Sequence, residues 1–289
     1  MALTYNILVM RRLYESFIVL ALTSLLPSCG KLIKEDRDAC PGILYFNLDE
    51  ELDGEDRIDA SVYLMPIQEL AAKGSTTAWD VQQKDFSFSL RRADIWGGYA
   101  LIGRKNCGEP DGSCLMVPEG SEWDALYLSN YSVSGRQEEV TVSLFFRKEY
   151  AALNLIFVDP EQYYLDSETF PFDVVVKGNS CGIDALSGVP VQGPFSCRPQ
   201  EYTEGSFVCK IPRQADTALV MEIWGRDGIY LNSDLLARVP IGEMIVQQTG
   251  ISWTEENLPD IVLEVQYAQN EFYVKVLDWE PQTHVLGQL

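Results

Sequence analysis

The sequence predicts an all-β protein built from two β-sandwiches. Apolar and polar residues alternate over most of the chain, and Gly, Pro, Asn or Asp residues bound the alternating runs, a pattern typical of half-buried strands and turns. The runs recur about every ten residues, as in sandwich folds. A length of 289 residues suits one or two domains. We favour two domains, because one strand ends in charged residues and another begins within 147–151.

Each alternating run predicts one strand. The last two runs flank residues 268–270 and predict a terminal hairpin. The predicted strands cover 43–48, 58–65, 85–90, 98–103, 140–146, 153–158, 172–176, 206–211, 218–224, 261–267 and 271–277.

Helical patterns are few and short. Ser252 and Glu255 have the spacing of a capping box, which predicts one helical turn that Pro259 stops. The predicted helical segments are 66–73, 242–248 and the single turn at 252–255, and residues 121–128 are expected to form a turn or a short helix.

The charge balance excludes one class of partner. The chain has 22 basic and 43 acidic residues, with a net charge of −21. Such a surface repels phosphate backbones, so we expect no nucleic-acid binding. Aromatic residues are plentiful, and the acidity therefore does not indicate disorder.

Catalytic and cofactor motifs are absent from the sequence. The only histidine is His284, near the C-terminus, so a histidine-dependent triad would rely on a tail residue and no multi-histidine metal site can form. Neither a phosphate-binding loop nor a dinucleotide fingerprint occurs. We therefore expect a protein that is not an enzyme and has no cofactor or bound metal.

The N-terminus predicts a lipoprotein signal peptide. Arg11 and Arg12 precede the apolar run 17–26, which is too short to span a bilayer. Residues 26–30, Leu-Pro-Ser-Cys-Gly, resemble a lipobox, in which cleavage falls between Ser28 and Cys29 and the Cys29 thiol carries the lipid. Two or three acyl chains give durable membrane anchoring. The alternative is an ordinary secretory signal whose cysteine joins a disulfide, and translation could start at Met1 or Met10.

The segment behind Cys29 is rich in acidic residues. It resembles the export signal that sends Bacteroidetes lipoproteins to the cell surface, and it also reads as a solvated tether. The expected organisation is a signal peptide at 1–28, a lipidated tether at 29–41 and sandwich domains at 42–148 and 149–289. The expected location is the outer membrane, at the cell surface.

Six cysteines remain if Cys29 carries lipid, and an even number outside the cytoplasm permits disulfides. Cys107 and Cys114 flank a turn-rich segment and could close a loop. Cys197 and Cys209 could clip a hairpin. Buried free thiols are the alternative.

An ordered series of motifs in the last hundred residues resembles the FimB/Mfa-type fimbrial anchor family of Bacteroidetes. The series includes 188–195, 211–214, 239–243, 250–253, 257–261 and 278–280, and the lipid cysteine and charged tether fit the same family. The motif residues to which the resemblance gives a structural role are Pro212, Arg213, Gly242, Glu243, Trp253, Pro259, Asp260 and Trp279.

The resemblance implies two transthyretin-like sandwiches and a role at the base of a fimbria. Members tether the fibre to the outer membrane and can limit its length, and pilins of this class join by strand complementation. Residues 280–289 are few and Pro281 interrupts them, so this tail looks short for a donor strand. The tail therefore indicates either a subunit that accepts a strand and donates none, or an ordinary frayed end.

Two other functions fit the same composition. One is a glycan-binding surface lipoprotein of a polysaccharide-uptake system, with Trp96, Trp123 or Trp224 lining a sugar site, although tryptophans at strand spacing are more typical of packing. The other is a tip-type adhesin subunit.

Overall fold

The computed structural model describes residues 42–48, 60–66, 77–80, 87–90, 95–134, 137–161, 163–165, 172–203, 205–226, 235–268 and 271–277. The expected signal peptide, the lipid site at Ser28 and Cys29, most of the helix expected at 66–73, Trp279 and His284 lie outside these residues.

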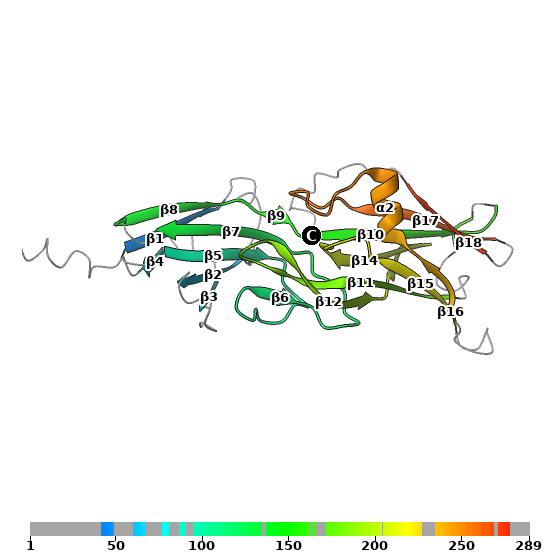
Figure 1. Ribbon diagram of the computed structural model, residues 1–289, viewed down its shortest axis with the longest axis horizontal. Coiled ribbons are helices and arrows are strands. Elements are labelled where there is room, and N and C mark those ends of the chain that lie inside the picture. Colours follow the sequence, from blue (N-terminus) through cyan, green and yellow to red (C-terminus); the bar gives the residue numbers. More distant parts are fainter. Residues whose placement is uncertain are drawn as a thin grey trace, which may run out of the picture.

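The described residues form β-strands with one helix (Figure 1). The elements are β1 (Gly42–Leu48), β2 (Ala60–Pro66), β3 (Thr77–Asp80), β4 (Ser87–Leu90), β5 (Ile95–Ile102), β6 (Cys114–Met116), β7 (Tyr127–Ser134), β8 (Glu139–Leu144), β9 (Arg147–Lys148), β10 (Tyr150–Val158), β11 (Phe172–Asp184), β12 (Val189–Cys197), β13 (Gln200–Thr203), β14 (Ser206–Pro212), β15 (Val220–Gly225), β16 (Leu235–Val239), α2 (Ile241–Thr249), β17 (Ile261–Ala268) and β18 (Glu271–Val276).

Four sheets divide the molecule into two halves that lie end to end (Figure 1). Sheet A has the order β4-β1-β8 and sheet B the order β3-β2-β5-β7-β9, and together they form the N-terminal half. Sheet C has the order β12-β11-β15-β16, and sheet D has the order β13-β14-β10-β17-β18. These two form the C-terminal half. The all-β expectation is confirmed.

The two halves repeat one strand order. In sheet A, β1 pairs antiparallel with β4 and parallel with β8. In sheet D, β10 pairs antiparallel with β14 and parallel with β17. The order β3-β2-β5-β7 of sheet B likewise matches β12-β11-β15-β16 of sheet C. Seven strands of each half therefore correspond in chain order, whereas β6, β9, β13 and β18 have no counterpart among the described strands, and the sequence shows no visible repeat.

One segment of the N-terminal half crosses into the other half. β6 pairs with the end of β11, where Leu115 lies opposite Ile183. A Cβ added to Gly182 would lie 2.0 Å from the carbonyl oxygen of Leu115, so only glycine allows this approach. Beyond β6, the Trp123 N–H donates to the carbonyl of Lys210 over 3.1 Å. The boundary expected at 148/149 therefore assigns most strands to the half in which they pair, but β6 precedes the boundary and pairs in the C-terminal half. The division into two domains stays a prediction.

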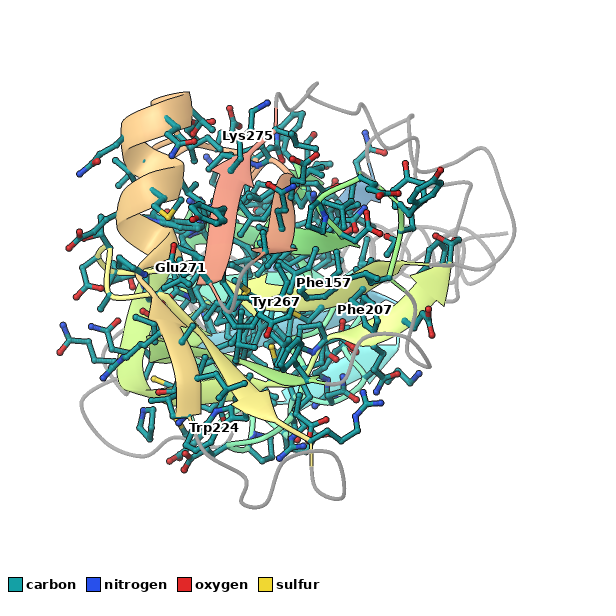
Figure 2. The ribbon with its side chains drawn as sticks, turned by 90° about the vertical axis from the view of Figure 1, so that its right-hand side faces the viewer. Phe157, Phe207, Trp224, Tyr267, Glu271 and Lys275 are labelled. Atoms are coloured by element: carbon teal, nitrogen blue, oxygen red, sulfur yellow. The ribbon has the colours of Figure 1, made fainter. Side chains whose placement is uncertain are left out.

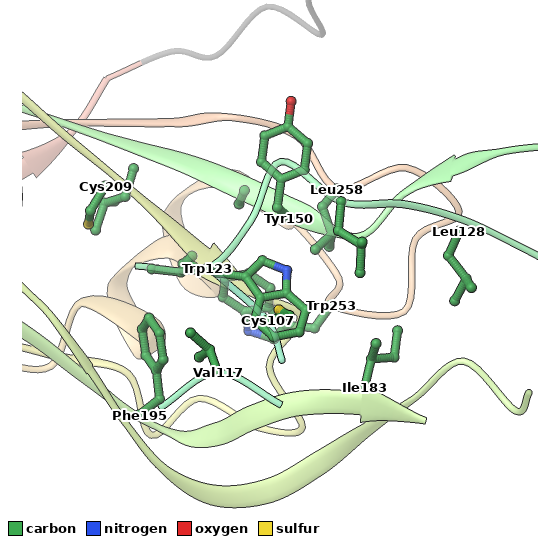
Figure 3. Close-up of a cluster of buried hydrophobic side chains, with 14 of the residues drawn as sticks. Cys107, Val117, Trp123, Leu128, Tyr150, Ile183, Phe195, Cys209, Trp253 and Leu258 are labelled. Carbon is green, nitrogen blue, oxygen red and sulfur yellow. The ribbon is translucent and has the colours of Figure 1, made fainter. Parts of the chain in front are cut away.

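The core is continuous across the junction. Figure 3 shows a cluster in which Trp123 and Leu128 from the first half pack with Phe195, Cys209 and Trp253 from the second. All five side chains are buried. Such close-packed continuity favours a rigid connection between the halves over a hinge.

Most sequence-based elements are confirmed, with one clear error. The predicted strands match β1, β2, β4, β5, β8, β10, β11, β14, β15, β17 and β18, and the helix predicted at 242–248 is α2. Residues 252–255 form a turn in which the Ser252 N–H donates to Glu255 Oε1 over 3.0 Å. The turn or short helix expected at 121–128 was wrong, because residues 122–126 form neither, Trp123 is held by hydrogen bonds to Lys210 and Glu149, and β7 begins at Tyr127.

Candidate interaction site

Sheet A holds the strand that follows the expected tether. β1 is its middle strand, with four residue pairs to β4 and six to β8. Leu44 is completely buried and Phe46 packs against the core. Tyr45 on the opposite face is exposed. This alternation explains why the period-two pattern located β1, and ladders on both sides fix the strand in place.

β8 forms one edge of sheet A. Figure 1 places β8 at the upper margin of the N-terminal half, and no described strand pairs with its outer side. Val140 and Val142 lie opposite Leu44 and Phe46, and because paired residues share a face, both valines face the core. Thr141 and Ser143 point outward and are exposed. Phe145, just past the strand, is 69% exposed.

The corresponding strand of the C-terminal half has no such open edge. β17 pairs with β10 in the same parallel arrangement, and β18 covers its other side. Ile261, Leu263 and Val265 of β17 are at most 1% exposed. Of their counterparts on β8, Val140 and Val142 are only partly buried, whereas Leu144 is fully buried. The inner face of β8 therefore keeps apolar surface that β17 has buried.

β18 and α2 supply the missing cover in the C-terminal half. Figure 2 shows α2 standing beside the strand that carries Glu271 and Lys275. Phe272 makes an edge-to-face contact with Phe172, with ring centroids 5.1 Å apart, and Val276 is buried. Gln248 of α2 accepts a hydrogen bond from the Val276 N–H over 3.2 Å. No described helix or strand takes these places beside β8.

A buried charge cluster lies where the two halves meet. Glu149 is fully buried between Arg147 and Arg213, and Arg213 Nε lies 2.6 Å from Glu149 Oε2. Arg213 Nη1 also donates to the carbonyls of Trp253 and Glu255, over 2.5 and 2.7 Å. The partner charges compensate the desolvation of Glu149. Arg213 thus ties the end of β14 to the loop that follows α2.

A second ion pair fixes the same loop. Lys148 Nζ lies 2.5 Å from Asp260 Oδ1, which also accepts the Ala152 N–H over 2.8 Å. The Lys148 N–H donates to Asn257 Oδ1 over 2.8 Å. The ammonium of Lys148 lies 4.5 Å from the ring centre of Tyr150. These contacts join the β9–β10 connection to residues before β17.

The other motif residues lie around α2 and the same loop. The Gly242 N–H donates to the Leu219 carbonyl over 2.8 Å, and a Cβ there would lie 2.5 Å from the Thr217 carbonyl oxygen. Pro212 and Pro259 are buried, while Glu243 is exposed in the first turn of α2. Seven of the eight motif residues are therefore described, and most of these pack at the junction, away from sheet A.

The cysteines considered for disulfides are free thiols in the structure. Cys197 on β12 and Cys209 on β14 are buried and in contact. Their strands belong to different sheets, so the two cysteines do not lie on one hairpin, contrary to the expectation. The hydrogen bond with Cys197, together with burial, raises the pKa of the Cys209 thiol well above its usual value. Burial also raises the pKa of the Cys107 thiol, while Cys114 lies on β6.

The three tryptophans weighed for a sugar site have different settings. Trp123 is 1% exposed, and its Nε1 donates to the Glu149 carbonyl over 3.1 Å, so it is a core residue. Trp96 packs against the core. Trp224 is half-buried and borders a depression of about 640 Å³ on sheet C, with Asp173 and Lys177 beside it. Figure 2 places Trp224 on the opposite side of the half from Lys275.

No group of three or more His, Cys, Asp or Glu side chains in the described part of the chain could hold a metal ion. Within the same residues, no helix has the length and apolar character needed to cross a membrane.

Sequence reasoning missed two buried acids. Glu149 belongs to the charged run that we interpreted only as a domain break. Asp124 is 2% exposed and accepts the N–H groups of Lys105, Asn106 and Cys107 over 2.6 to 2.8 Å. The signal for Glu149 was a charged run flanked by strands, whereas nothing local distinguishes Asp124 from a surface acid.

Solved structures with the same fold come from Bacteroides and Porphyromonas. A candidate adhesin from Bacteroides ovatus matches with a TM-score of 0.56 at 9% identity, covering 84% of this chain and 97% of its own. A candidate polysaccharide-binding protein from Bacteroides thetaiotaomicron matches at 0.54 and 10%, over 84% and 100%. The fimbrial anchor protein Mfa2 from Porphyromonas gingivalis matches at 0.53 and 10%, over 83% and 98%.

At such identities the likeness shows the fold alone. No family model matches the sequence, and no curated protein matches it.

Proposed function

We propose that this chain is a non-catalytic surface lipoprotein that anchors a fimbria to the outer membrane. In this proposal Cys29 carries the lipid, residues 29–41 form the tether, and two transthyretin-like sandwiches, 42–148 and 149–289, form the folded part. A fimbrial subunit binds by strand complementation, and the anchor limits fibre length. The fold shared with Mfa2 supports the proposal.

The position of β1 is the observation that carries the proposal. β1 begins directly behind the expected tether and is paired on both sides within sheet A. Tension between the lipid and a bound fibre would pull β1 along its own axis. Its hydrogen bonds to both neighbouring strands would then have to break together, so many bonds resist the force at once. A strand at a sheet edge would have one ladder only. The central position suits a protein that must hold an external load.

The junction supports the same role. A load applied to one half must pass to the other, and a continuous core with the Arg147–Glu149 and Lys148–Asp260 ion pairs connects them. Such a connection favours a rigid elongated molecule over two domains joined by a flexible linker.

The first experiment compares fimbriae on cells carrying the wild-type chain, Cys29→Ala or a deletion. Electron microscopy measures fibre length and attachment, and co-purification measures the association of the fimbrial subunit. We expect long, detached fibres in both mutants and co-purification of the subunit with the wild type. Unchanged fibres with no subunit bound to the wild type would exclude the anchor role.

A glycan-binding surface protein is the second candidate. The depression beside Trp224 favours it, because an aromatic face flanked by Asp173, Lys177 and Arg198 matches the mixed apolar and hydroxyl surface of a sugar. A glycan array with wild type and Trp224→Ala tests this candidate. Oligosaccharide binding that the substitution abolishes would favour it over the anchor.

A further inference from the structure

We propose that the outer edge of β8 is the docking site for the fimbrial subunit, which adds an extended strand antiparallel to β8. This inference rests on the proposed function and identifies the edge at which it operates. The partner strand would take the place beside β8 that β18 takes beside β17. Because the two halves share a strand order, the pairing of β18 with β17 shows how an added strand would pair with β8.

The corresponding strands β8 and β17 differ in whether a second strand covers their outer side. β8 and β17 occupy the same place beside β1 and β10, with the same parallel pairing. β17 has a second neighbour and buries Leu263 completely. In the described part of the chain β8 has one neighbour, and Val142 at the position of Leu263 stays partly exposed. An added strand would pair the free backbone groups of β8 and cover Val142.

The other edge of sheet A offers less to a partner. In the C-terminal half, β13 covers the counterpart of β4, but all four residues of β13 are exposed, so that strand adds no core side chain. β18 instead packs Phe272 and Val274 against the core and buries Val276. An added strand would therefore bury more apolar surface beside β8, where the described part of the N-terminal half has no equivalent of β18.

β18 also indicates the chemistry of the incoming segment. Its apolar residues alternate with polar ones, so one face meets the core and the other meets water. Lys275 lies opposite Glu264 of β17. β8 begins with Glu139 after Glu138, and it contains no basic residue. We therefore expect a strand with apolar residues at alternate positions and a basic residue near Glu139. Phe145, exposed at the far end of β8, would contact a further apolar side chain.

Retention of β1 makes an edge the available route. β1 fills the middle of sheet A and is paired on both sides. While it stays in place, an incoming strand cannot enter between β4 and β8. Addition at the β8 edge leaves β1, and with it the tether, undisturbed.

Photo-crosslinking of the full chain on fimbriated cells tests the site. A photoreactive amino acid replaces Thr141 or Ser143, which point outward from β8, or Leu236, an exposed residue on the edge strand β16 that serves as the control. We expect crosslinks from both β8 positions to one extended segment of the fimbrial subunit, identified by mass spectrometry, and none from Leu236. Crosslinks from β8 only to a second copy or to residues 278–289 of the same chain would overturn the inference.

A matched pair of substitutions gives an independent readout. Val142→Lys places a charge on the inner side of the edge, where it opposes strand addition, and Leu236→Lys places one on the β16 edge. We expect Val142→Lys to lower the recovery of the fimbrial subunit at least about tenfold and Leu236→Lys to leave it unchanged. The melting temperature of each purified variant separates lost docking from lost folding. Equal recovery with all three chains would contradict the inference.

The outcome also separates this inference from the anchor role. If Cys29→Ala releases the fibres but β8 crosslinks to no fimbrial subunit, the anchor role stands and the β8 site is wrong. If Cys29→Ala leaves the fibres unchanged and no subunit associates, the anchor role fails, and the docking site fails with it.

Discussion

The two halves of this protein share a strand order and differ in how their sheets end. In the C-terminal half, β18 and α2 cover β17, and its inward-facing residues Ile261, Leu263 and Val265 are buried. In the N-terminal half, β8 is an edge strand among the described residues, and two inward-facing valines stay partly exposed. The same topology can therefore leave this edge open or cover it, and at this edge the difference is the added hairpin strand β18 and the helix α2. β18 keeps β17 from pairing with other chains, whereas the outer side of β8 is left available among the described residues.

Removing β18 should make the C-terminal half resemble the open N-terminal half. A chain ending at Ala268 loses the contacts of Phe272, Val274 and Val276, which we expect to cost on the order of 5 kcal/mol. Urea denaturation measures the loss, and light scattering should detect association through the exposed β17 edge. A chain ending at Leu277 is the control. Equal stability of the two truncations would mean that β18 does not close the half.

Breaking the charge cluster tests how much it stabilises the junction between the halves. Arg213→Ala leaves the buried Glu149 with Arg147 as its only ion-pair partner, and we expect the free energy of unfolding to fall by about 3–5 kcal/mol. Arg198→Ala, an exposed control, should change it by less than about 0.5 kcal/mol. A loss below about 1 kcal/mol for Arg213→Ala would indicate that the cluster contributes little to the junction.

Equivalent positions on β17 and β8 sharpen the comparison. Leu263→Ala empties a fully buried site and should cost about 2–5 kcal/mol. Val142→Ala, at the partly exposed counterpart, should cost only about 1 kcal/mol in the isolated protein. Chemical denaturation of both variants provides the measurement. Similar costs at the two sites would show that the β8 edge is already covered, against the docking site.

Thiol labelling reports the same closure without changing stability. The raised pKa values of Cys107 and Cys209 leave less thiolate at a given pH, so both should react slowly with iodoacetamide at pH 8. Both are also buried and should react fully only after unfolding. Cys181, which is partly exposed, is the internal control. Mass spectrometry of the labelled native protein provides the readout, and rapid labelling of Cys209 would contradict the closed core described for the C-terminal half.

The sequence located strands best where one face is buried. β1, β10 and β17 alternate because water lies on one side and the core on the other, and that pattern is local. β12 was missed, because its two prolines and one glycine interrupt the pattern, and a strand at a sheet edge tolerates them. The segment before β7 was wrongly predicted to be helical, because its conformation depends on hydrogen bonds to Lys210 and Glu149, far away in the sequence.

The sequence alone determined the class of fold, the positions of most core strands and the absence of catalytic motifs, because each depends on residue type and local spacing. Only the tertiary structure decided which strands neighbour one another, how β6 joins the second half, and that Arg213 meets Glu149 across 64 residues. It alone distinguished an open edge at β8 from a covered one at β17. The two strands have similar sequence patterns, and the difference arises from what lies beside each of them.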